Sequence, residues 1–217
     1  ASRRQFHLIT DRWGLMPAFQ FKDAGRPVGY SSHPDALADA VGESRNWDLT
    51  SFAEFVLTGR LTAPHCYYAR LRSMTLGTTT TLSQREPGVW SEEVRHYFQP
   101  RHRVEPETRC DALADEFAEA FRGAVSRRTN PFLGKSVIGL SGGLDSRTIL
   151  CASDNRDSWI AFSCFDTENN EFQVAQAIAK AAGVEFLPFQ RGMDYYGDSA
   201  AMGARISGGM GCIASNH

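Results

Sequence analysis

A glycine-rich turn in the second half of the chain has the residue types needed to bind phosphate. Residues 141–146 read Ser-Gly-Gly-Leu-Asp-Ser. Gly142 and Gly143 allow the backbone to approach a ligand closely, and a helix start directly after them offers unpaired N–H groups and a partial positive charge. Ser141 and Ser146 add hydroxyl donors. The turn therefore predicts an oxyanion or phosphate site, with a serine-capped structural connection as the alternative.

Asp145 stands inside this turn and suits a metal ion better than direct contact with phosphate. A carboxylate and a phosphate repel each other, whereas Mg²⁺ is commonly held between one or two carboxylates and phosphate oxygens. We therefore expect Asp145 to ligate Mg²⁺. Arg147, just after the turn, is a candidate for neutralising phosphate charge, and a solvated helix surface is its alternative.

Two other motifs overlap the same segment and fit it less well. Residues 134–136, Gly-Lys-Ser, are similar to the end of a Walker A loop, but position 129 is threonine where that loop needs glycine. Residues 139–143, Gly-Leu-Ser-Gly-Gly, match the turn that carries the nucleophile in serine hydrolases. That chemistry needs a downstream histidine, and only His217 follows. We therefore expect neither class.

A strand must precede the turn and a helix must follow it, and the flanking pattern predicts both. The apolar run at 136–140 is typical of a buried parallel strand. The later elements are expected as helix 147–152, strand 159–165, helix 171–182 and strand 184–189. This alternation predicts right-handed crossovers and a doubly wound parallel sheet, an α/β fold.

A long helix is expected ahead of this sheet, over 108–128. Four apolar residues recur along it at every fourth position: Leu113, Phe117, Phe121 and Val125. That stripe predicts a face packed against a sheet. Before it, residues 99–107 hold two prolines and four charges, which is typical of a linker. We therefore predict domains at 1–99 and 100–217.

The first hundred residues predict short strands and turns with two helices. The strands are expected at 5–10, 18–22, 28–31, 66–71 and 78–82. Pro34 suits the first turn of a helix that ends near Val41. Ser51 and Glu54 have the spacing of a capping box for a second helix, and Gly59 is placed to end it.

Composition and charge exclude several classes of function. The 217 residues carry 23 basic and 25 acidic side chains, a formal net charge of −2, so we expect neither nucleic acid nor a membrane surface as partner. No apolar run approaches the length of about 18 residues that a membrane-spanning helix needs. The five cysteines form no Cys-x-x-Cys pair and predict free thiols in the cytoplasm.

Residues 140–146 closely resemble the SGGxDS pyrophosphate loop of the N-type ATP pyrophosphatases. Two further segments resemble glutamine-hydrolysing asparagine synthetases in particular. Residues 11–17, Asp-Arg-Trp-Gly-Leu-Met-Pro, are similar to a segment of their glutaminase domain. Residues 171–179, followed by Gly183, are similar to the helix after the loop. The resemblance implies the C-terminal part of a glutaminase-like (Ntn-type) α+β domain, followed by the N-terminal part of an ATP-binding domain.

The same resemblance implies an ATP- and Mg²⁺-dependent ligase that forms an amide. A carboxylate of a small molecule or peptide would be adenylylated, and an amine, with glutamine as the nitrogen donor in asparagine synthetases proper, would displace AMP. Leu140 and Cys164 would lie beside adenine. Pyrophosphate would be held by Ser141, Gly142, Gly143 and Ser146. Asp145 would ligate Mg²⁺, and the catalytic residues stay open.

The chain also departs from that family. Ala1 stands where the family's glutaminase has its N-terminal cysteine, and Asn170-Glu171 stands where the family has Asp-Glu. We expect the 217 residues to be an inactive piece of a longer protein. The alternatives are a β-lactam synthetase or lasso-peptide cyclase branch, a tRNA-modifying relative, or a non-catalytic nucleotide-binding module. A homodimer and the role of the glycine cluster at 207–211 stay open.

Overall fold

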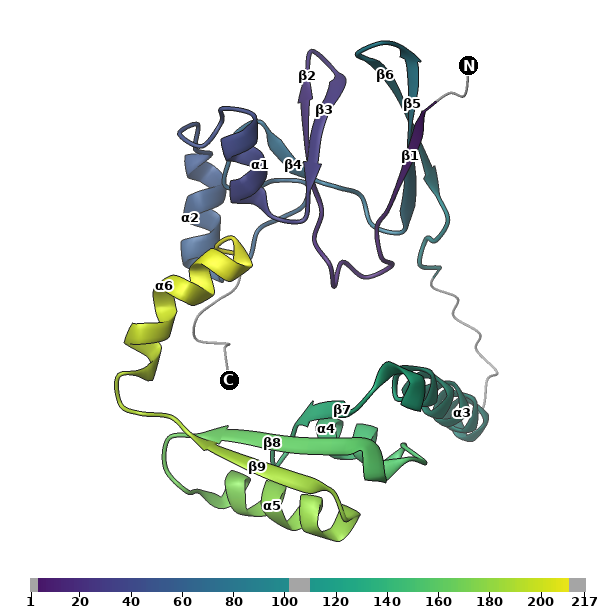
Figure 1. The fold of residues 1–217 in the computed structure, drawn as a ribbon, viewed down its shortest axis with the longest axis vertical. Coiled ribbons are helices and arrows are strands. Elements are labelled where there is room, and N and C mark those ends of the chain that lie inside the picture. The colour runs from purple at the N-terminus through teal and green to yellow at the C-terminus, as the bar shows by residue number, and fades with distance from the viewer. Residues whose placement is uncertain (1–3, 102–109, 211–217) are drawn as a thin grey trace. The chain divides into compact units, whose positions relative to one another are not determined.

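The computed structural model describes residues 4–101 and 110–210 (Figure 1). The architecture is mixed α/β, with one parallel and two antiparallel sheets of three strands each. The chain divides into two compact units. Among described residues, the first unit comprises 4–101 and 199–210, and the second comprises 110–198. No helix of the described chain is both long and apolar enough to cross a membrane.

The first unit contains the two antiparallel sheets. One sheet has the order β1-β5-β6 and is formed by Gln5–Ile9, Thr78–Glu86 and Val89–His96. The other has the order β3-β2-β4 and is formed by Arg26–Ser31, Phe19–Asp23 and Leu71–Ser73. Glu92 of β6 joins the two sheets, because its carboxylate accepts a hydrogen bond from Tyr30 at 2.7 Å and pairs with Lys22. Burial and this carboxylate raise the pKa of Tyr30.

Two helices, α1 (Pro34–Ala40) and α2 (Leu49–Thr58), complete this unit. Its buried core is formed by Phe19, Phe21, Leu37, Ala38, Cys66, Tyr67, Tyr68 and Leu71. Met210, beyond α6 (Tyr195–Ser207), also packs on this core. Gly208 and Gly209 make the turn between α6 and Met210 with φ of 61° and 70°, which glycine adopts without strain.

The second unit holds the parallel sheet, β7-β8-β9. Its strands are Ser136–Gly139, Trp159–Phe165 and Glu185–Gln190. The helices α4 (Leu144–Cys151) and α5 (Asn170–Ala182) connect them. Ile138, Ala161 and Phe186 lie in register across the three strands, and Leu150 of α4 with Ala175 and Ala179 of α5 packs over this row. Both helices therefore cover one face of the sheet.

The strand–helix–strand–helix–strand prediction is confirmed, and β8 has the predicted bounds. The strand order follows the chain order, so the described strands include no reversal of order. The doubly wound arrangement stays a prediction. Two short 3₁₀ turns, η1 (Pro131–Leu133) and η2 (Arg156–Ser158), precede β7 and β8.

The long helix α3 spans Cys110–Arg128, and the first two residues predicted for it lie outside the described chain. Most of the predicted linker, 102–107, lies outside it too. The expected apolar face is only partly buried. Val125 is 6% exposed, whereas Phe117 is 70% exposed and stacks on Phe121 with ring centroids 6.0 Å apart. The stripe therefore packs through its C-terminal end alone.

The predicted capping box of α2 is wrong. Asp48 is the N-cap, and its carboxylate accepts the N–H groups of Thr50 at 3.1 Å and Ser51 at 3.3 Å. The Glu54 carboxylate instead accepts the N–H of Thr62 at 3.1 Å, because the chain beyond the helix folds back beside it. The predicted helix stop is confirmed, since Gly59 has φ 70° and its N–H donates to Phe55 at 2.7 Å.

Three further predictions differ from the structure. Only Leu71 of the strand expected over 66–71 enters β4, because the preceding residues fill the core from a turn. The helix after the glycine turn begins at Leu144 instead of residue 147. Strand β6 and helix α6 were not predicted. Apolar and polar residues do not alternate regularly in β6, and small residues interrupt the apolar pattern of α6. Neither sequence therefore shows a clear apolar period.

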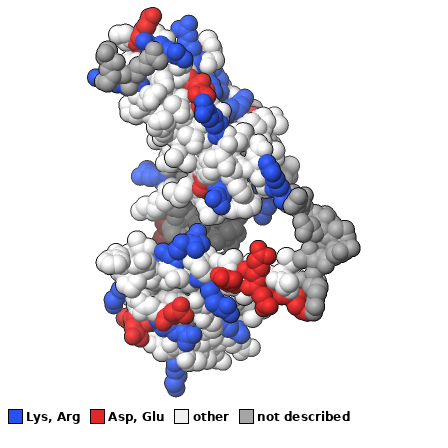
Figure 2. Space-filling view, turned by 90° about the vertical axis from the view of Figure 1, so that its right-hand side faces the viewer, with Lys and Arg blue, Asp and Glu red and all other residues white. Residues whose placement is uncertain are grey.

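Charged side chains of both signs are interspersed on the face drawn in Figure 2. Lys and Arg lie among Asp and Glu over the described residues there. This face therefore shows no single continuous basic field.

Candidate nucleotide site

The glycine-rich turn lies between the end of β7 and the start of α4, where the sequence places it. Gly139 is in register with Phe162 of β8, and the Leu140 N–H extends the ladder by donating to the Phe162 carbonyl at 2.7 Å. The Leu140 side chain is 2% exposed and belongs to the core under the sheet. The turn is therefore anchored on its strand side by both a backbone bond and a buried side chain.

Two serine hydroxyls shape the turn from inside. The Ser141 Oγ accepts the N–H of Gly143 at 3.2 Å, and the Ser146 Oγ accepts the N–H of Ser141 at 3.3 Å. Each hydroxyl keeps its own proton for donation to a ligand. The two serines thus hold the backbone curved and also add donors to it.

Gly142 lies against the start of α5. A Cβ atom at position 142 would stand 3.2 Å from the Glu171 Cα and 3.1 Å from its Cγ. Such separations are closer than ordinary van der Waals contact, so any side chain here would push the turn away from α5. The close approach, and not the backbone conformation, favours glycine at position 142, because the φ of Gly142 lies outside the left-handed region.

The first turn of α4 directly follows the glycine-rich turn. Gly143 is its N-cap, and the first N–H groups of any α-helix have no acceptor within the helix. Asp145 lies in this first turn with its side chain exposed. Arg147 crosses back over the turn, and its Nη2 donates to the Gly142 carbonyl at 3.1 Å. Its Nε is buried and finds no partner among the described residues.

A cavity of about 630 Å³ opens at the carboxyl ends of the three parallel strands. Its walls are formed by Gly139, Leu140, Ser141, Phe162, Ser163, Cys164, Phe165, Asp166, Thr167, Asn169, Glu171, Phe172 and Arg191. Cavities of about 300–1,000 Å³ are typical of small-molecule sites, and this edge is where ligands bind in parallel α/β sheets. Every wall residue belongs to the second unit.

Three further polar residues of the cavity wall are held by contacts of their own. Asn169 caps α5, since its side chain accepts the Phe172 N–H at 2.9 Å. Asp166, directly after β8, pairs with Arg191, directly after β9, through Oδ1 and Nε at 2.8 Å. The cavity wall therefore combines aromatic side chains with charged ones.

The structure brings Leu140, Ser141 and Cys164 to one cavity, with Gly142, Gly143, Asp145 and Ser146 in the turn that bounds it. Sequence reasoning missed Asp166, Asn169 and Arg191. One signal was present, because the residues directly after parallel strands gather at a common edge. Among the described residues, no three His, Cys, Asp or Glu side chains converge in a way that could hold a metal ion by themselves.

The segment 11–17, which carries the resemblance of the first unit, forms a tight structural turn. The Asp11 carboxylate accepts the N–H groups of Met16 at 2.9 Å, Trp13 at 2.8 Å and Leu15 at 3.1 Å. These backbone donors, that of Met16 first, lower the pKa of Asp11. Trp13 packs edge-on against Phe98, with ring centroids 5.5 Å apart.

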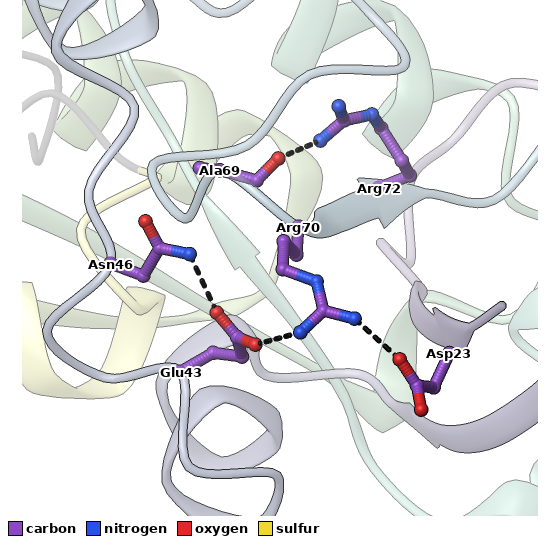
Figure 3. Close-up of polar contacts among 6 residues, drawn as sticks. All are labelled: Asp23, Glu43, Asn46, Ala69, Arg70 and Arg72. Atoms are coloured by element: carbon purple, nitrogen blue, oxygen red, sulfur yellow. Dashed lines mark hydrogen bonds and ion pairs between the residues drawn. The ribbon is translucent and has the colours of Figure 1, made fainter.

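A second polar cluster lies in the first unit, around Arg70 (Figure 3). Arg70 donates through Nη1 to Glu43 at 2.6 Å and through Nη2 to Asp23 at 2.7 Å, and its guanidinium lies 4.8 Å from the Phe21 ring centre. The other Glu43 oxygen accepts from Asn46 at 2.8 Å. Both Nη groups and both Glu43 oxygens are thus engaged, so the cluster joins loops of this unit.

The whole sequence matches no protein-family model and no curated protein.

Proposed function

We propose that the chain carries the nucleotide-binding site of an ATP-dependent, AMP-forming ligase of the asparagine synthetase type. The observation that supports this most is the Ser-Gly-Gly-Leu-Asp-Ser turn, which follows the parallel edge strand β7, begins a helix and borders a cavity of about 630 Å³. Phosphate groups favour such a position because backbone N–H groups and the helix dipole converge there.

The residues present fit a nucleoside triphosphate with Mg²⁺. Gly142 and Gly143 leave the backbone at the middle of the turn without side chains, and the Arg147 guanidinium places positive charge beside it. Asp145 offers an exposed carboxylate in the first turn of α4. One carboxylate together with phosphate oxygens and water is a usual Mg²⁺ environment, and the ion would neutralise phosphate charge there.

The proposed reaction has two steps. A substrate carboxylate oxygen attacks the α-phosphorus of ATP, the bond to the bridging oxygen breaks, and pyrophosphate leaves with that electron pair. An amine nitrogen then attacks the acyl carbon, loses a proton, and AMP leaves as the amide forms. The backbone N–H groups and the hydroxyls of Ser141 and Ser146 stabilise the charge that develops on pyrophosphate.

The finer domain identities belong to the same proposal. We assign the first unit to a glutaminase-like (Ntn-type) domain and the second to the ATP pyrophosphatase domain, with glutamine as the source of the amine. Two antiparallel sheets joined through Glu92 support the first assignment. The four cysteines among described residues are free thiols, which supports a cytoplasmic setting.

The proposal is tested by Asp145→Asn, with Asp157→Asn as the matched control, since Asp157 is exposed in η2 and lies outside the cavity. By calorimetry, we expect Asp145→Asn to weaken ATP binding in Mg²⁺ by about tenfold, because one charged ligand is lost. In EDTA the substitution should not weaken binding, because no metal ion is held and the Asp145 carboxylate only repels phosphate. Equal affinity of Asp145→Asn and the parent in Mg²⁺ would contradict the metal role.

The reaction itself is tested on the full-length protein by exchange of labelled pyrophosphate into ATP with a panel of carboxylates. Exchange that needs both a carboxylate and Asp145 supports a ligase. ATP binding without exchange indicates a nucleotide-binding module without turnover. Failure of the parent chain to bind ATP would remove the proposed function.

A further inference from the structure

Arg191 is the positively charged residue among those that line the cavity, and the proposed function gives it no role. It follows β9 directly, and its N–H donates to the Phe165 carbonyl at 2.8 Å, which continues the pairing of β9 with β8. Its side chain is 11% exposed and lines the cavity. Arg191 is therefore held at the carboxyl edge of the sheet by backbone pairing and largely withdrawn from solvent.

Three contacts orient its guanidinium. The Nε pairs with the Asp166 carboxylate at 2.8 Å, and the central carbon lies 5.2 Å from the Tyr196 ring centre and 5.9 Å from that of Tyr195. Burial lowers the pKa of Arg191, but the Asp166 carboxylate, Tyr196 and Cys164 together raise it by more, so the net shift of the pKa is upward. The group thus stays charged and has a defined orientation.

One donor of this oriented group is unused. The Arg191 Nη1 is buried and has no hydrogen-bond partner within the described residues. Burying a charged donor without an acceptor is unfavourable, and most buried donors in folded proteins are satisfied. Arg70 makes a useful contrast, because both of its Nη groups reach carboxylates within the protein. The unsatisfied Nη1 therefore indicates an acceptor supplied from outside the described residues.

The sheet register places Arg191 on the far side of the cavity from the glycine turn. Phe165 pairs with Gln190, so Arg191 lies one step beyond the end of the ladder, while Leu140 lies one step beyond the pair Gly139–Phe162. Two strand spacings and three residue steps separate them, which gives about 14 Å between backbones. A ligand of nucleotide size spans such a distance.

We propose that Arg191 is an oxyanion-binding residue of this cavity, with Nη1 donating to an anionic oxygen of the bound ligand. The inference rests on the proposed function for the identity of that ligand. The oxygen belongs either to a nucleotide phosphate or to the carboxylate of the acyl substrate, and both present the same acceptor to a guanidinium. Asp166 acts on Arg191 as a positioning residue.

The test compares Arg191→Met with Arg156→Met in the 217-residue chain. Methionine keeps most of the apolar stem and removes the charge, and Arg156 is an exposed arginine of η2 outside the cavity. Calorimetry is done with AMP, with adenosine, and with acetate in the presence of saturating AMP. Because a charged hydrogen bond is lost, we expect Arg191→Met to weaken one anionic ligand about tenfold or more.

The pattern of losses identifies the source of the oxygen. Weaker AMP binding with unchanged adenosine binding assigns it to the phosphate, and weaker acetate binding with unchanged AMP binding assigns it to the carboxylate. Equal losses for AMP and adenosine indicate a structural role only and overturn the inference. So does the absence of any loss relative to Arg156→Met, because water then satisfies Nη1.

A second measurement does not depend on the folding of Arg191→Met. The side-chain N–H signals of Arg191 in the parent chain are assigned by their absence from Arg191→Lys in ¹H–¹⁵N spectra. We expect them to shift with AMP or with inorganic phosphate or acetate, and not with adenosine. If the parent binds no ATP but these signals shift with phosphate, the proposed function fails and the Arg191 inference stands. If no anion shifts them, the Arg191 inference fails.

Discussion

At the residue scale, the candidate site depends on what two glycines leave out. Gly142 allows the turn to lie against Glu171 at a separation that a Cβ would violate. Gly143 is the N-cap of α4 and directs its N–H back to Ser141. Their lack of side chains therefore fixes how closely the turn approaches α5 and how open its backbone stays to a ligand.

The substitution Gly142→Ala tests this close approach. We expect ATP affinity to fall at least tenfold, because a methyl group 3.2 Å from the Glu171 Cα displaces the turn that we propose binds phosphate. Gly197→Ala is the control, since a Cβ there meets nothing within 4 Å in α6. Calorimetry on both variants checks the prediction. Unchanged ATP affinity in Gly142→Ala would show that the turn does not need this contact.

At the scale of elements, side-chain caps fix where three helical segments begin, and one of these caps explains why the start of α2 differs from its prediction. Asp48, Asn130 and Asn169 each accept a backbone N–H at the start of a helical segment. The Asp48 carboxylate has a lowered pKa, because it accepts from the backbone and hydroxyl of Ser51 and then from the Thr50 N–H. The start of α2 is therefore coupled to the ionisation of Asp48.

Asp48→Ala is expected to lower the free energy of unfolding at pH 7 by about 1 kcal/mol, the usual cost of losing an N-cap. Since the folded-state pKa is depressed, this contribution is present above the unfolded pKa of about 3.9 and is lost as the pH falls through the folded pKa. Asp48→Asn is the control, because asparagine caps without titrating. Thermal melts from pH 7 to pH 3 measure the difference in stability between the parent and Asp48→Ala. A stability difference that stays constant over this pH range would contradict the coupling.

At the scale of the whole molecule, the proposed nucleotide site is contained in one of the two units. The glycine turn, α4, α5 and the strand ends that bound the cavity all lie within residues 110–198. The first unit has its own core, its own two sheets and its own polar cluster around Arg70. Ligand contacts and first-unit packing are therefore built from separate sets of residues.

Hydrogen exchange measured by mass spectrometry tests this division. We expect Mg²⁺-ATP to slow exchange in peptides that cover the glycine turn and the ends of β8 and β9, because ligand contacts suppress local opening. Peptides from β1 to β6 should be unaffected. Adenosine is the control, since it lacks the phosphates that the turn receives. Equal protection in both units would contradict a site built by the second unit alone.

How much of this was predictable from the sequence differs between segments. The bounds of β8 and α5 were predicted almost to the residue, because a short apolar run and a helix that ends before a glycine are local signals. The Ser141–Ser146 run likewise indicated its place between strand and helix. The start of α2 was misplaced because Asp48 and Ser51 are both acceptable caps, and only packing chooses between them.

The phosphate-type turn thus follows from local residue order alone, since its glycines, serines and helix start are consecutive. The opposite wall of the cavity does not. Asp166 and Arg191 are 25 residues apart and meet only because β8 and β9 pair in parallel and end at the same edge. Sequence spacing carries no record of that register, which is decided by the side chains that pack on the sheet. The oriented, partly unsatisfied guanidinium is therefore a product of the tertiary structure.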